Sequence, residues 1–81
     1  MKISNRSELK EVFHEAANQN LQICIGLKIS GIIGEELVIS QPEDLSKKLS
    51  YYLTRFDENL NHKCGKAKIV SASVVFSMML I

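Results

Sequence analysis

The sequence predicts a single α+β domain over residues 1–81, with the element order α-β-β-α-β. Two stretches show apolar side chains at three- and four-residue steps, the spacing of amphipathic helices. Between them, apolar residues alternate with polar or small ones, as in a half-buried strand. Glycine and proline at the joins predict turns. These patterns predict a three-stranded sheet in the order 2-1-3, with both helices on one face.

The first helix is predicted to begin near Asn5. Asn5 and Glu8 have the spacing of a capping box, and Ser7 is a competing cap. After this start, apolar residues recur every three or four positions, at Leu9, Val12, Phe13 and Ala16. We therefore expect one side of this helix to face the core.

A β-hairpin is predicted to follow. Residues from Leu21 to Ile29 alternate between apolar and polar or small side chains, which predicts the first strand. Gly31 and Gly34 tolerate positive φ, so the chain can turn back into a second strand from Glu35 to Gln41. The two strands are expected to pair antiparallel.

The second helix is predicted from Pro42 onward, because proline is preset for a first helical turn and acids suit the positive end of the helix dipole. Its apolar stripe predicts an end between Asn59 and Asn61. A third strand is expected from Ala67 to Met79. A right-handed crossover would place it beside the first strand and parallel to the second. The stripe consists of Leu45, Leu49, Tyr52, Leu53, Phe56 and Leu60.

One face of the predicted sheet is left without a helix layer. By alternation, Leu37 and Ile39 are placed toward the helices, whereas Gly26 and Ser40 belong to the uncovered face. Small side chains dominate that face, so another surface could approach it closely. It is either a partner interface or an ordinary solvent-facing sheet. Its candidate interface residues are Cys24, Lys28, Val38, Ser71, Ser73, Val75 and Ser77.

Composition favours association. A chain of 81 residues supports a marginal core, and 46% hydrophobic residues are many for that length. We therefore expect a homo-oligomer or a stable protein partner. The apolar run from Ile69 to Ile81 is interrupted by serines and too short to span a bilayer, so no membrane contact is expected. The first residues lack the apolar centre of a signal peptide, which predicts a cytoplasmic protein with reduced thiols.

No catalytic or cofactor chemistry is predicted. The metal-ligand types His14, His62, Cys24 and Cys64 lack the paired spacing of zinc sites. Cys64 and His62 also lack an evident third group to orient them for nucleophilic catalysis. The glycines lie in a strand and a hairpin rather than in a phosphate-binding loop between a strand and a helix. We expect no enzyme activity, no cofactor and no metal.

Nucleic-acid binding is the alternative function. A basic strip on the second helix and beyond it, with Tyr51 available for base stacking, is the combination that such binding requires. The other interpretation is a solvated helix face balanced by Asp57 and Glu58, and the net charge of +1 favours it. The strip consists of Lys47, Lys48 and Arg55 on the helix, with Lys63, Lys66 and Lys68 beyond it, and the candidate contacts are Lys47, Lys48, Arg55 and Lys63.

The second half of the chain resembles a small protein family. Residues 41–52, then 56–60 and 68–70, are similar to a pattern in small uncharacterised proteins of Gram-positive bacteria and their phages. The resemblance implies a cytoplasmic accessory protein of a phage or mobile element, which would inhibit or adapt a host protein. Together with the uncovered sheet face, it predicts a non-enzymatic protein-interaction module that associates with itself.

Overall fold

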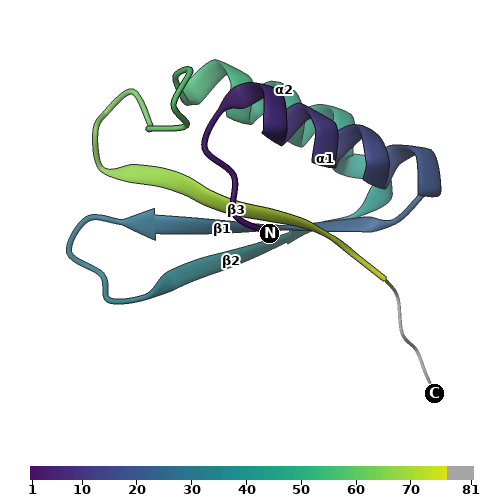
Figure 1. Ribbon diagram of the computed structural model, residues 1–81, viewed down its shortest axis with the longest axis horizontal. Coiled ribbons are helices and arrows are strands. Elements are labelled where there is room, and N and C mark those ends of the chain that lie inside the picture. Colours follow the sequence, from purple (N-terminus) through teal and green to yellow (C-terminus); the bar gives the residue numbers. More distant parts are fainter. Residues whose placement is uncertain (77–81) are drawn as a thin grey trace.

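The computed structural model describes residues 1–76 and confirms the α+β architecture (Figure 1). The central strand pairs antiparallel with both neighbours, so the sheet order is β2-β1-β3. Both helices lie on the same side of the sheet. The elements are α1 (Arg6–Gln19), β1 (Gln22–Ile29), β2 (Glu35–Ser40), the short 3-10 helix η1 (Pro42–Asp44), α2 (Leu45–Arg55) and β3 (Ala67–Val75).

The start of α1 is fixed by side chains that cap it. The amide of Glu8 donates to Asn5 Oδ1 at 2.9 Å, which confirms Asn5 as the cap. The Glu8 carboxylate accepts from the amide of Ser4 at 2.7 Å, one residue earlier than in a standard capping box. At the other end, Asn20 adopts the left-handed conformation with φ 56°, a common way for a helix to stop.

Helix α2 is shorter than its apolar stripe predicts, because it ends at Arg55 rather than between Asn59 and Asn61. Asp57 Oδ1 accepts from the amides of Asn59 and Asn61, both at 2.9 Å, so this carboxylate builds a turn where the helix was expected to continue. Leu60 lies in that turn with φ 65° and is fully buried. The turn thus continues the apolar stripe into the core without a helix.

Strand β2 presents the opposite face from the one predicted. Val38 pairs with Ile25 and Ser40 pairs with Ile23, and both isoleucines are fully buried beneath the helices. Cross-strand partners share a face, so Val38 and Ser40 point toward the helix layer. Leu37 and Ile39 therefore lie on the uncovered face, where they are 66% and 49% exposed.

This error has a simple cause. Residues 37–39 are all apolar, so alternation alone does not decide which of them face the core. The hairpin loop decides it, by placing Lys28 opposite Glu35.

The core lies between the sheet and the two helices. The first residues also pair with the outer edge of β3: the Ile3 amide donates to the Val70 carbonyl at 3.2 Å, and the Ala72 amide donates to the Met1 carbonyl at 3.0 Å. Beside this pairing, β3 has a bulge opposite Gly26 and Leu27. The buried apolar residues are Ile3, Leu9, Val12, Phe13, Ala16, Ile23, Ile25, Leu45, Tyr52, Phe56, Leu60, Ile69 and Ala72.

Candidate functional site

The uncovered side of the sheet, here called the open face, is the main candidate site. The view in Figure 1 shows the helices on one side of the sheet and no element of residues 1–76 on the other. Strand register places eleven residues on it: Gln22, Cys24, Gly26, Lys28, Glu35, Leu37, Ile39, Lys68, Ser71, Ser73 and Val75.

Five of the seven predicted interface residues lie on the open face, namely Cys24, Lys28, Ser71, Ser73 and Val75. Val38 was wrongly placed there, because it pairs with the buried Ile25 on the helix side. Ser77 lies outside the described residues. Whether these residues contact a partner remains a prediction.

The centre of the open face is closely packed around Gly26. A Cβ atom at this position would clash with Ser71 Oγ and would lie 2.7 Å from Glu35 Oε1. The Ser71 hydroxymethyl group and the Glu35 carboxylate therefore cover the glycine from the two neighbouring strands. Gly26 is consequently buried although it lies on the uncovered side of the sheet.

Leu37 and Ile39 are the residues of this site that the sequence reasoning missed. They stand on β2, the edge strand that pairs with β1 alone among the described strands. More exposed apolar side chains lie beyond the strand ends: Ile32 (49%) and Ile33 (101%) in the hairpin loop, and Phe76 (62%) after β3. Exposed apolar side chains on and around a sheet without a covering layer are typical of an interaction surface.

The outer side of α2 is the second candidate site. Lys47, Tyr51 and Arg55 follow one another at four-residue steps and are all exposed, so they form one row. The Arg55 guanidinium carbon lies 5.1 Å from the centre of the Tyr51 ring, within cation–π range. The Lys63 amide donates to the Arg55 carbonyl at 2.9 Å, which brings the following loop to the end of the row. Lys48 is half-buried beside it.

Charges are unevenly distributed along the chain. Residues 45–68 contain six cations (Lys47, Lys48, Arg55, Lys63, Lys66, Lys68) and two acids (Asp57, Glu58), a local charge of +4. Residues 35–44 contain four acids and no cation, a local charge of −4. The near-zero net charge of the chain therefore includes a basic segment over residues 45–68. The Asp57 carboxylate accepts hydrogen bonds from two backbone amides there.

His62 and Cys64 have a structural role in the loop that precedes β3. The Cys64 amide donates to His62 Nδ1 at 3.0 Å, and the imidazole packs edge-on against the Phe56 ring with centroids 5.0 Å apart. Among residues 1–76, no group of three or more His, Cys, Asp or Glu side chains is arranged to hold a metal ion.

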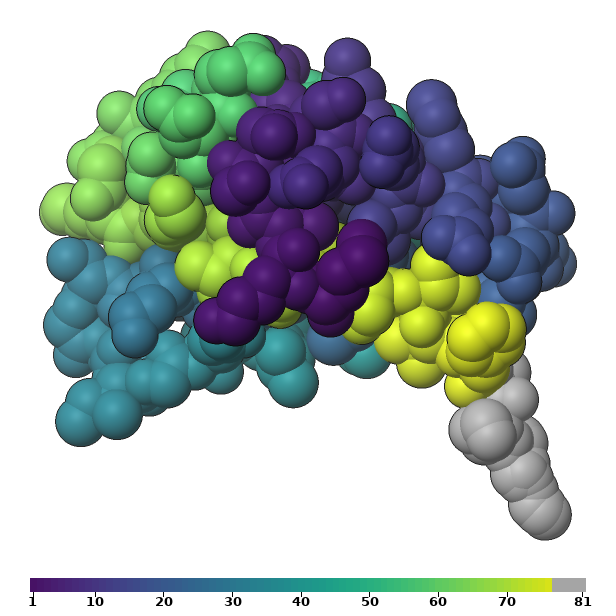
Figure 2. All heavy atoms as spheres, in the orientation of Figure 1, coloured from purple at the N-terminus to yellow at the C-terminus, as the bar shows by residue number. Residues whose placement is uncertain are grey.

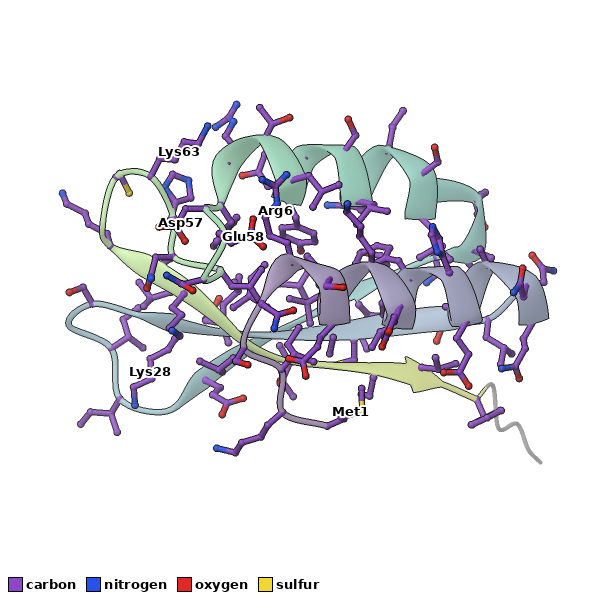
Figure 3. All side chains as sticks on the ribbon, turned by 45° about the horizontal axis from the view of Figure 1, so that its top comes forward. Met1, Arg6, Lys28, Asp57, Glu58 and Lys63 are labelled. Carbon is purple, nitrogen blue, oxygen red and sulfur yellow. The ribbon has the colours of Figure 1, made fainter. Side chains whose placement is uncertain are left out.

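Arg6 is a further residue that the sequence reasoning did not single out. Its Nη2 donates to the Leu53 carbonyl at 2.9 Å, and its amide donates to the Glu58 carbonyl at 3.2 Å. Figure 3 shows Arg6 near Asp57 and Glu58, below the end of α2. A cation at a helix C-terminus is favourable because carbonyls there lack helical partners. Arg6 thereby fixes the end of α2 against the start of α1.

Tyr52 is the titratable group whose environment is most altered. It is buried between Phe13 and Phe56, with ring centroids 6.2 and 5.8 Å away. This burial, and to a smaller extent the neighbouring Tyr51, raises the pKa of the Tyr52 phenol above its ordinary value of 10.0.

Comparisons with protein-family models, with curated proteins and with solved structures found no match to this chain. Across residues 1–76, neither helix has the length and apolar content needed to cross a membrane.

Proposed function

We propose that the protein is a non-enzymatic interaction module that associates with a second copy of itself through the open face. The observation that carries the proposal is the exposure of Leu37 and Ile39 beside small side chains on a sheet face that no described element covers. Burying these two residues between copies removes apolar surface from water, at about 25 cal/mol per Å².

The size of the face indicates how the copies would meet. Eight residues of β1 extend about 26 Å and three strands are about 14 Å wide, so the sheet offers roughly 370 Å² in projection. A standard interface buries about 800 Å² on each partner. A stable dimer therefore needs more surface than the sheet alone; the exposed apolar side chains beyond its two ends are Ile32 and Ile33 in the hairpin loop and Phe76 after β3.

Polar residues on the face are compatible with a two-fold arrangement. Lys28 and Glu35 lie directly opposite each other near the hairpin end. In a two-fold interface, a contact from one residue to a second residue of the other copy is repeated in the opposite direction. Lys28 of each copy can therefore pair with Glu35 of the other across the axis. The small residues Cys24 and Ser73 allow the sheets to approach to about 10 Å.

The experiment is a mass measurement by light scattering coupled to size exclusion. The unmodified chain is expected at twice its 9.1 kDa, and Leu37→Glu at 9.1 kDa, because a buried carboxylate without a partner is costly. Tyr51→Glu is the matched control: it adds the same charge at an exposed apolar position on α2 and should leave the dimer intact. A monomeric unmodified chain, or a dimeric Leu37→Glu, contradicts the proposal.

Inhibition or adaptation of a host protein is the finer part of this proposal. It is supported by the resemblance of residues 41–52, 56–60 and 68–70 to small uncharacterised proteins of Gram-positive bacteria and their phages, and the same open face would serve as the contact surface. Affinity capture with Leu37→Glu as the comparison tests it. A host protein retained equally by both forms would contradict use of this face.

Nucleic-acid binding through α2 is a second candidate, favoured by the row of Lys47, Tyr51 and Arg55 on a helix that contains no acid. Binding to phosphates displaces counterions, so affinity should fall steeply as salt rises. Filter binding with a single-stranded oligonucleotide over a salt series tests this. Tyr51→Ala should weaken binding, because stacking on one base contributes about 1–3 kcal/mol. An absence of oligonucleotide binding at low salt would contradict nucleic-acid binding through α2.

A further inference from the structure

An open hollow of about 340 Å³ lies at one end of the sheet, between the hairpin loop and the loop that precedes β3. Figures 1 and 2 show these two loops at the same end of the molecule. Three of the residues that line the hollow are lysines: Lys28, Lys66 and Lys68. Among residues 1–76, no acidic side chain lines it.

Backbone hydrogen bonds hold the walls of the hollow together. The Ser30 amide donates to the Lys66 carbonyl at 2.9 Å and joins the two loops directly. The Gly65 amide donates to the His62 carbonyl at 2.8 Å, and the His62 amide donates to the Ala67 carbonyl at 2.7 Å. Gly65 has φ 80°, a conformation that favours glycine. The lysines therefore lie on two loops that backbone hydrogen bonds hold together.

The lining of the hollow brings positively charged residues together without an acidic neighbour among the lining residues. Lys28 and Lys68 are direct cross-strand partners, and like charges in such positions repel. Glu35, opposite Lys28 on the other side, directs its carboxylate over Gly26. Lys68 Nζ reaches the Asn59 carbonyl only at 3.4 Å, a long and weak hydrogen bond. Three positive charges thus lack a carboxylate in the wall they share.

We propose that this hollow binds a doubly charged phosphate group, such as the terminal phosphate of a phosphorylated small molecule. Lysine ammonium groups bind phosphate as mobile point charges, and three of them can neutralise a dianion. The volume lies at the lower end of the range for small-molecule pockets, which is about 300–1,000 Å³. No aromatic side chain lines the hollow, so recognition would depend on the phosphate rather than on a stacked base.

The test is calorimetric titration with inorganic pyrophosphate at low salt. Saturable one-to-one binding is expected, and Lys66→Gln should weaken it about tenfold, because a charge-assisted hydrogen bond is lost. Lys66 is exposed and lies outside the open face, so this change leaves self-association intact. Lys66→Arg should retain most of the affinity. Lys10→Gln, which removes an exposed lysine on α1, is the matched control and should bind normally.

Two results overturn the proposal. One is pyrophosphate binding that is non-saturable or that falls equally in Lys66→Gln and Lys10→Gln, which would show general attraction to surface lysines. The other is a Lys66-dependent interaction with a single-stranded oligonucleotide without pyrophosphate binding, which would assign the lysines to a phosphodiester backbone. Because Lys28 and Ile32 line the hollow and also belong to the proposed dimer contact, the mass of Lys66→Gln is measured alongside and should equal that of the unmodified chain.

Discussion

At the scale of single residues, a side chain at Gly26 is expected to destabilise the fold, because Ser71 and Glu35 occupy the space that it would need. Gly26→Ala should lower the free energy of unfolding by about 1–3 kcal/mol, the usual cost of overpacking. The Ser71 hydroxyl makes the closest contact, so the same change in a Ser71→Ala background should cost less. Urea unfolding at one fixed protein concentration measures both costs. Equal costs in the two backgrounds would show that this hydroxyl is not the obstacle.

The raised pKa of Tyr52 predicts that the folded protein loses stability at alkaline pH. Its raised pKa means that the folded chain keeps the phenol proton to higher pH than the unfolded chain does. Stability is therefore full below about pH 10, where both states are protonated, and is lost as pH rises beyond that value, because the unfolded chain releases the phenol proton first. Stability should fall above about pH 10, and Tyr52→Phe should reduce that slope. An unchanged slope in unfolding curves between pH 9 and 11 would contradict this assignment.

At the scale of elements, the turn after α2 depends on the Asp57 carboxylate, which accepts two backbone amides. Asp57→Ala should destabilise the fold by about 1–2 kcal/mol, because each hydrogen bond contributes about 1 kcal/mol. Asp57→Asn retains an acceptor of the same shape, so it should cost less than half as much. Chemical denaturation of the three proteins separates hydrogen bonding from charge. If alanine and asparagine were equivalent, charge rather than the turn would be responsible.

The same turn shows which parts of the fold the sequence patterns predict and which they do not. Apolar spacing predicted both helices and the strands of the hairpin, because each depends on a period of several residues, and the preference for right-handed crossovers predicted the strand order. The apolar spacing placed the end of α2 too late in the chain. Leu60 continues the apolar stripe, but it lies in a turn that the Asp57 side chain builds. The apolar spacing also assigned the wrong face of β2 to the core. Three successive apolar residues hide the two-residue period there, and the loop geometry sets the register. Most of the open face was predictable, whereas Leu37 and Ile39 required the paired strands.

At the scale of the whole molecule, self-association through the open face would couple stability to concentration. Folded dimer and unfolded monomer are then the two end states, so mass action raises the melting temperature as protein is added. For a domain of this size, the increase should be about 5–10 °C over a hundredfold range of concentration.

Leu37→Glu should abolish that dependence and melt at one temperature throughout, because its monomer unfolds without a change in molecularity. Leu37 is two-thirds exposed in the single chain, so the substitution removes no core contact and the monomer should still fold. Scanning calorimetry at matched scan rates makes the measurement, with Tyr51→Glu expected to follow the unmodified chain. A melting temperature independent of concentration in all three proteins would mean that the open face is solvated, and that the folded monomer is stable with Leu37 and Ile39 in water.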